Sequence, residues 1–185
     1  SEDELLQSIC HAIVHQRGYH MAWVGYVQHD ENKSIKIMAY ASDNGDYPDT
    51  MQPTWAEKEH GMGPSGRAVR SGATQLCQDI ANDPHYSPWR DEALQRGYAA
   101  SIALPLLNEE NKVFGTLTVY AEEVNAFTPA EVDLLEEMAG DLAFGVRTLH
   151  TRHERDLSPV QHQEQLVPLQ DSLEDTVRAI ATIVE

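Results

Sequence analysis

Hydroxyl side chains alternate with aliphatic ones along two apolar segments of the sequence. In residues 98–107 and 113–120, every second position is aliphatic: Ile102, Leu104, Leu106, Leu117 and Val119. A period of two predicts β-strands with one face covered by helices. The opposite face carries the hydroxyls of Ser101, Thr116, Thr118 and Tyr120, which can donate and accept hydrogen bonds. That face could form the floor of a pocket.

Histidines are the next residues with chemistry to offer. His11 and His15 are four residues apart, and His150 and His153 three apart, on segments that we expect to be helical. Each pair has a spacing that one metal ion could bridge. No carboxylate motif accompanies either pair, so we interpret both as solvated helix faces and expect no metal and no resident cofactor.

The two cysteines indicate no redox or metal chemistry. Cys10 and Cys77 lie far apart in the sequence and form neither a paired metal-ligand pattern nor a disulfide framework. We interpret both as small buried residues.

Several elements must position the hydroxyl face. The short polar segment 108–112 predicts an antiparallel hairpin between the two strands. Thr128, Pro129 and Glu131 predict a helix start, because they supply a capping hydroxyl, a proline at the first helical position and a carboxylate at the third. Upstream, we expect a helix over residues 5–14 and a second hairpin from 21–28 and 34–41.

The segment from 42 to 96 is irregular and is interrupted by five prolines. Within it we expect a short helix at 64–72, a strand at 75–78 and another helix between 87 and 97. A long irregular excursion inside a compact domain is usually a lid or a binding loop. We therefore expect it to lie over the polar face of the sheet.

The acidic composition excludes several kinds of partner. The chain of 185 residues has 13 basic and 30 acidic side chains, a formal charge of −17, which repels nucleic acid and anionic membranes. No apolar run approaches the roughly 20 residues that cross a bilayer, and the first residues are acidic, unlike a signal peptide. We expect a cytoplasmic protein with no nucleic-acid partner and no membrane insertion.

The helix that starts near Thr128 carries apolar residues in alternating steps of three and four, a spacing typical of a coiled-coil seam. We predict that one face covers the sheet and that a second stripe joins two copies of the chain in a parallel homodimer. The predicted interface comprises Leu6, Ile9, Ile13, Val132, Leu135, Ala139, Leu142, Val146 and Leu149.

Five motifs occur in one order along the chain: the first hairpin, GMGPSGRAVRSG at 61–72, SIALPL at 101–106, FGTLTVY at 114–120 and FTPAE at 127–131. Together they resemble the GAF domain over roughly residues 1–150. The resemblance implies an α+β fold with an antiparallel sheet of five to six strands. It also implies terminal helices on one face of the sheet and a small-molecule pocket under an irregular lid on the other.

Carried over position by position, the resemblance places Ser101, Thr116, Thr118 and Tyr120 on the pocket floor and Trp89 in the lid, with Tyr26 as a further wall. Such a pocket suits a small, partly apolar ligand that aromatic rings contact and hydroxyls orient. In the alternative interpretation, Trp89 and Tyr120 fill the cavity as core aromatics. Trp23 and Trp55 are expected to pack in the core or lid.

We divide the chain into a GAF sensor domain (1–155), a linker (156–168) and the start of a helix (169–185) that leads to a downstream output domain. Residues 173–185 are similar to the helix that leads into HD-GYP phosphohydrolase domains, which cleave cyclic dinucleotides such as cyclic-di-GMP. The catalytic motifs of that family are absent from the chain. The resemblance thus implies a regulatory module that senses a small molecule, dimerises and controls an output domain.

Two alternatives remain open. Some GAF relatives reduce free methionine sulfoxide with a nucleophilic cysteine, but neither Cys10 nor Cys77 matches the positions that this chemistry needs. The other alternative is a ligand-free dimerisation spacer.

Overall fold

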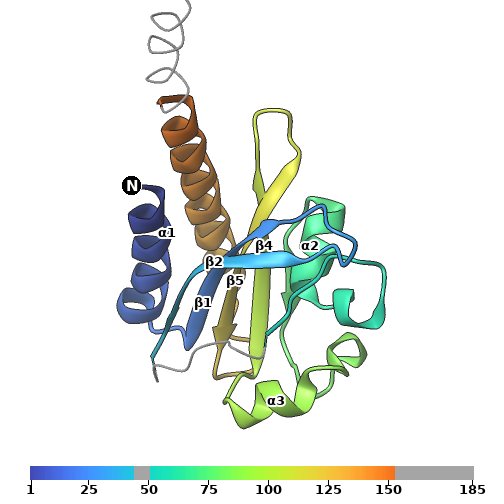
Figure 1. The fold of residues 1–185 in the computed structure, drawn as a ribbon. Helices are drawn as coiled ribbons and strands as arrows, with labels where there is room; N and C mark the ends of the chain where they lie inside the picture. The colour runs from blue at the N-terminus through green and yellow to red at the C-terminus, as the bar shows by residue number, and fades with distance from the viewer. Residues whose placement is uncertain (44–50, 153–185) are drawn as a thin grey trace, which may run out of the picture. The chain divides into compact units, whose positions relative to one another are not determined.

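Five antiparallel strands form one open sheet in the order β2-β1-β5-β4-β3 (Figure 1). The computed structural model describes residues 1–43 and 51–152. The strands are β1 (Met21–Val27), β2 (Ile35–Ser42), β3 (Gln75–Cys77), β4 (Ala100–Leu107) and β5 (Val113–Ala121). This arrangement confirms the predicted α+β fold and its antiparallel sheet.

The helices begin and end at residues suited to those positions. Helix α1 (Glu2–His11) begins with a capping box between Ser1 and Glu4 and continues as the π-helical turn Ala12–Gln16. Helix α2 (Pro64–Ser71) has proline in its first turn and ends at Gly72, whose φ of +65° favours glycine. Short 3₁₀ turns at Glu59–Gly61 and Pro84–Tyr86 precede α2 and α3 (Arg90–Gln95).

A further helix begins at residue 129 and is described over residues 129–152. The Thr128 backbone N–H donates to Glu131 Oε2 at 2.9 Å, and the Glu131 N–H donates to Thr128 Oγ1 at 3.4 Å. This reciprocal pair is the predicted capping box, so the start of this helix is confirmed.

The sheet separates two clusters of buried side chains. On one face, α1 and the helix from residue 129 lie side by side (Figure 1) over a core that includes Val24, Leu104, Leu117 and Val119. On the other face, α2 lies against β4 and β5, and a smaller cluster contains Met21, Trp23, Tyr86, Tyr98 and Tyr120. The alternation in β4 and β5 therefore sorts side chains between the faces as predicted.

The predicted dimer seam is corrected by this packing. Leu6, Ile13 and Leu135 are fully buried in the helix-side core of a single chain, Ala139, Leu142 and Val146 are almost so, and Ile9 and Val132 pack against that core. These side chains already cover their own sheet, so they present no apolar stripe to a second copy. The homodimer itself remains a prediction.

The chain divides into two units, Ser1–Val146 and Arg147–Glu185. Leu149 belongs to the second unit, of which residues 147–152 are described. The predicted linker 156–168 and the predicted helix 169–185 lie outside the described residues.

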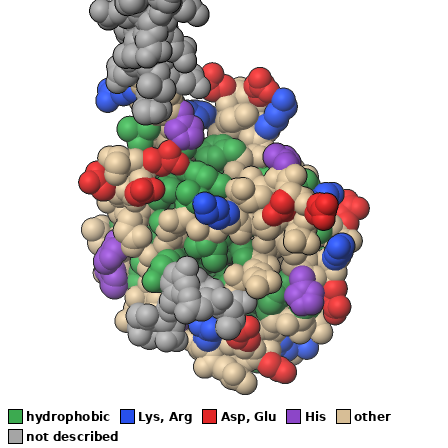
Figure 2. All heavy atoms as spheres, viewed as in Figure 1, with side chains coloured by type: hydrophobic (Ala, Val, Ile, Leu, Met, Phe, Trp, Pro, Cys, Tyr) green, Lys and Arg blue, Asp and Glu red, His purple; other side chains and the backbone are tan. Residues whose placement is uncertain are grey.

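No helix in the described ranges has the length and apolar character of a membrane span. On the face shown in Figure 2, hydrophobic side chains gather around a central Lys or Arg, with charged side chains of both signs toward the rim.

Candidate functional site

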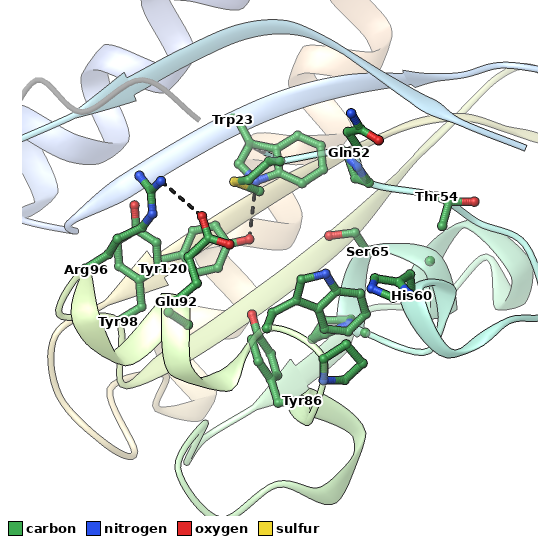
Figure 3. Close-up of a pocket in the computed structure, with 18 residues that line it drawn as sticks. Trp23, Gln52, Thr54, His60, Ser65, Tyr86, Glu92, Arg96, Tyr98 and Tyr120 are labelled. Atoms are coloured by element: carbon green, nitrogen blue, oxygen red, sulfur yellow. Dashed lines mark hydrogen bonds and ion pairs between the residues drawn. The ribbon is translucent and has the colours of Figure 1, made fainter. Parts of the chain in front are cut away.

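A cavity of about 330 Å³ lies on the sheet face opposite α1. Trp23 of β1 and Tyr120 of β5 form its floor, and three irregular parts of the chain form its walls (Figure 3). These parts are residues 51–54, residues 60–66 around the start of α2, and residues 86–98 around α3. The predicted lid therefore does lie over this face of the sheet.

Aromatic rings make up much of the wall. Tyr98 and Tyr120 are stacked with their ring centroids 4.5 Å apart, and the Trp89 ring packs edge-on against Tyr86 and His60 at 6.0 and 5.8 Å. The Trp23 Nε1–H points at the Tyr120 hydroxyl, 3.5 Å away. Rings offer a ligand large contact areas with few rotatable bonds, so this wall suits an apolar or flat molecule.

Trp89 and Tyr120, two of the predicted ligand-binding residues, thus line the cavity. Trp23, expected to pack in the core or lid, is fully buried and also lines it.

The other predicted floor residues lie behind this wall. Ser101 accepts a hydrogen bond from the Tyr86 hydroxyl at 3.0 Å, and Thr118 shares one with Ser65 at 3.0 Å. The Thr116 hydroxyl donates to the Leu104 carbonyl at 3.2 Å. All three hydroxyls are buried and already paired, and none of the three residues lines the cavity. Their role is corrected to that of supports, which hold wall residues and backbone in place.

Tyr26 lies on the wrong face of the sheet for the predicted role. Its side chain packs with the helix-side core, its ring meets Phe114 edge-on at 5.6 Å, and its hydroxyl donates to Glu2 at 2.5 Å. Burial, with the Glu2 carboxylate as a second cause, raises the pKa of Tyr26. Tyr26 shares its face with Ala22 and Val24, which alternate along β1 with the cavity-side residues Met21 and Trp23.

Arg70 holds the lid segment that precedes α2. Its Nη1 donates to the carbonyl oxygens of Trp55, Ala56 and Gly61 at 2.9, 3.2 and 2.8 Å. A Cβ atom at Gly61 would lie 1.8 Å from the Ala56 carbonyl oxygen, so only glycine fits here. One guanidinium therefore joins three backbone carbonyls of the segment, of which the Ala56 carbonyl also accepts from the Lys58 N–H at 2.8 Å.

The same segment is tied to the turn between β1 and β2. The Trp55 Nε1–H donates to the Gln28 carbonyl at 2.9 Å, and the Thr54 hydroxyl lies 2.9 Å from the Lys33 carbonyl. These bonds fix Thr54, which lines the cavity together with Gln52. Sequence reasoning missed these wall residues, and the glycine-rich motif at 61–72 was the signal that a close backbone approach occurs nearby.

Few charged groups face the cavity. Glu92 and Arg96 of the α3 region form an ion pair at 3.0 Å (Figure 3), and His60 lies in the wall that precedes α2. Burial raises the pKa of Tyr120, and it raises the pKa of Tyr86 well above its ordinary value. Both hydroxyls are protonated near neutral pH; that of Tyr86 donates to Ser101, and that of Tyr120 accepts from the Trp23 indole.

Neither cysteine lies in the cavity wall. Cys10 is buried in the helix-side core, and burial raises its pKa to about 12. Cys77 is buried at the end of β3, where burial and the Asp83 carboxylate raise its pKa to about 12. A thiol becomes a good nucleophile when its pKa is lowered, so both environments oppose redox catalysis.

The described residues include one cluster with metal-ligand spacing. The ligand atoms of His20, Asp43 and Glu122 lie within 4.8 Å of one another, outside the cavity wall. His11 and His15 are exposed and lie with their ring centroids 4.6 Å apart, with no carboxylate in such a cluster. His153 lies outside the described residues. Sequence reasoning missed the His20 cluster because its members are far apart along the chain.

An antiparallel sheet that carries helices on one face and a lidded cavity on the other defines a GAF-like α+β fold. The chain belongs to the GAF domain family, which matches residues 1–147. The family model covers both helical layers, the whole sheet and the cavity. No curated protein matches the chain in sequence.

Solved structures share this fold at low sequence identity. The GAF domain region of a protein described as a membrane protein from Geobacter sulfurreducens PCA is 19% identical, with a TM-score of 0.64 over 80% of this chain and 93% of that one. The type II free methionine-R-sulfoxide reductase from Thermoplasma acidophilum is 17% identical, with a TM-score of 0.62 over 77% and 89%. A domain of a protein described as a two-component sensor histidine kinase from Sinorhizobium meliloti 1021 is 15% identical, with a TM-score of 0.63 over 84% and 97%.

Proposed function

We propose that this GAF domain is the regulatory, small-molecule-sensing part of a signal transduction protein and is not itself an enzyme. The observation that carries the proposal is the aromatic-walled cavity of about 330 Å³ between Trp23, Tyr120 and the lid. Its volume lies within the range of pockets that bind small molecules.

The wall favours a small and partly apolar ligand. Stacked and edge-on rings line the cavity, and polar groups such as Ser65 and the Glu92–Arg96 pair stand at separate places around it. In such pockets a few polar groups fix the orientation of a ligand that is held mainly by apolar contact.

The alternative is a redox enzyme, because one protein with a similar fold is a free methionine-R-sulfoxide reductase. That similarity extends to the fold alone. The raised pKa values of Cys10 and Cys77, and their absence from the cavity wall, favour the sensing function over this alternative.

We further propose that the domain works as a homodimer and controls a downstream output domain, to which the predicted helix 169–185 leads. An HD-GYP phosphohydrolase is the candidate output, and this candidate is supported only by the resemblance of residues 173–185. A ligand-free dimerisation spacer is the remaining alternative.

Mass spectrometry of small molecules released from the denatured protein tests the sensing function. We expect a specific compound from the purified wild type and much less from Trp89→Ala, because Trp89 lines the cavity. Leu94→Ala is the matched control, since Leu94 lies on α3 but is 43% exposed and outside the cavity wall. The released compound, added back, should raise the melting temperature of the wild type.

Other outcomes would contradict the proposal. If no compound is released and Trp89→Ala lowers the melting temperature strongly, the aromatic residues are structural plugs and the domain is a spacer. If the protein reduces free methionine sulfoxide and loses that activity on Cys77→Ala, the domain is an enzyme.

A further inference from the structure

Three polar side chains meet at one end of the sheet, outside the cavity wall. His20 precedes β1, Asp43 follows β2 and Glu122 follows β5. β1 lies between β2 and β5 and runs antiparallel to both. The start of β1 and the ends of β2 and β5 therefore lie at the same end of the sheet. His20 Nδ1 lies 2.6 Å from Glu122 Oε1 and 3.0 Å from Asp43 Oδ2.

The backbone fixes these residues relative to one another. The His20 N–H donates to the Tyr120 carbonyl at 3.0 Å, and the Asp43 N–H donates to the His20 carbonyl at 3.1 Å. The His20 residue is only 8% exposed, and its ring meets Tyr98 edge-on at 5.3 Å. The imidazole is therefore held in place, while the carboxylate side chains, 42% and 63% exposed, can adjust toward it.

The imidazole directs its polar contacts at the two carboxylates. Nδ1 contacts both of them, whereas Nε2 is buried without a hydrogen-bond partner among the described residues. One imidazole nitrogen thus faces two carboxylate oxygens, and all three are atoms that can bind a metal ion. The two carboxylates follow two different strands.

We propose that His20, Asp43 and Glu122 bind a divalent transition-metal cation of the Zn²⁺ type. The cation would take the place of the proton that Nδ1 now shares with the carboxylates. Protein ligands lie about 2.0–2.2 Å from a tetrahedral Zn²⁺, so neighbouring ligand atoms are roughly 3.4 Å apart. The exposed carboxylates, now 3.0 and 2.6 Å from Nδ1, would therefore move outward by less than about 1 Å to admit the ion. Imidazole and carboxylate together are donors that Zn²⁺ accepts, and water would complete the coordination at the exposed side.

Charge favours a cation at this place. Two carboxylates and a neutral imidazole offset a divalent charge, and the chain as a whole has a formal charge of −17. The bound cation would join the start of β1 to the ends of β2 and β5. Its ligand His20 also packs against Tyr98, which lines the cavity, so the cation would stiffen one wall of the pocket. The site itself does not depend on the proposed sensing function.

Calorimetric titration of the full, tag-free chain with ZnCl₂ tests the site, and melting temperatures in ZnCl₂ and in EDTA give a second measurement. We expect one Zn²⁺ per chain and a higher melting temperature with Zn²⁺ than with EDTA. Glu122→Gln and Asp43→Asn should each weaken Zn²⁺ binding about tenfold or more. MgCl₂ should bind much more weakly, because Mg²⁺ disfavours imidazole.

Glu123→Gln is the matched control, since it removes the same charge one residue away from the cluster and should leave Zn²⁺ affinity unchanged. Unchanged Zn²⁺ affinity in Glu122→Gln, or its loss in His11→Gln, would assign the binding to surface histidines and overturn the proposal. No Zn²⁺ binding by the wild type would show that the three side chains form only a hydrogen-bonded ion pair. The carboxylate variants keep the test decisive if His20→Gln fails to fold.

Discussion

Gly63 lies directly against the Trp89 indole: a Cβ atom at residue 63 would come within 2.9 Å of ring carbon Cζ3. Gly63→Ala must therefore displace the indole from its place in the cavity wall. We expect greater quenching of tryptophan fluorescence by acrylamide than in the wild type.

The control for this variant is Gly140→Ala, because a Cβ atom at Gly140 meets nothing within 4 Å. Gly140 lies inside a helix, so the control should raise stability by about 0.5–1 kcal/mol and leave quenching unchanged. Equal quenching in wild type and Gly63→Ala would show that the ring does not pack on Gly63 in solution.

The buried hydrogen bond from Tyr86 to Ser101 can be measured by a double-mutant cycle. Tyr86→Phe leaves the Ser101 hydroxyl without its partner at 3.0 Å, and should lower the free energy of unfolding by about 1–2 kcal/mol. The double variant with Ser101→Ala should lose less than the sum of the two single variants, because it leaves no buried polar group unpaired. Additive losses in urea unfolding would show that the two hydroxyls do not interact.

Both cysteines should resist alkylation in the folded protein. A pKa raised from an ordinary value near 9.0 to about 12 lowers the thiolate fraction at pH 8 by roughly a thousandfold. We expect almost no reaction with iodoacetamide at pH 8 until a denaturant is added, after which Cys10 and Cys77 both react. A rapidly alkylated cysteine in the native protein would support the redox alternative.

The capping carboxyl of Glu131 should make the free energy of unfolding depend on pH in the acid range. Hydrogen bonds from the Thr128 backbone N–H and hydroxyl lower the pKa of this carboxyl in the folded chain. Its stabilising contribution is therefore present above the unfolded-state pKa of about 4.3 and is lost as the pH falls through the lower folded-state pKa.

Glu131→Gln should flatten that acid-side decline, as measured by urea unfolding from pH 3 to pH 7. The control is Glu137→Gln, an exposed carboxylate on the same helix, which should leave the decline unchanged. A decline in Glu131→Gln as steep as in the wild type would contradict the role of the capping box.

The sequence predicts the sheet well where one face is apolar and the other polar. In β4 and β5 the alternation identified which residues face the helices, and the Thr128–Glu131 pattern identified the start of the following helix. Strand β1 is apolar on both faces, so its pattern does not say which way Tyr26 points. The strand pattern therefore offers no check on the wall position that the resemblance implies for Tyr26, and the structure corrects that position.

The cavity wall could not be predicted for another reason. Its shape depends on single side chains that bind distant carbonyls, such as Arg70 to Trp55 and Gly61, and no local period reports such contacts.

The seam prediction failed because apolar residues in steps of three and four are found both in a helix that covers its own sheet and in one that joins a partner. Burial of Leu135 and Leu142 shows the first case here.

The alternation along β5 places neighbouring residues on the two opposite faces of the sheet. Tyr120 lies in the cavity floor, while its neighbours Val119 and Ala121 lie in the core under the helices. A ligand in contact with Tyr120 would thus be one residue away from side chains that pack in the core under the helices. The same stretch of backbone therefore belongs to both the cavity floor and the core under the helices.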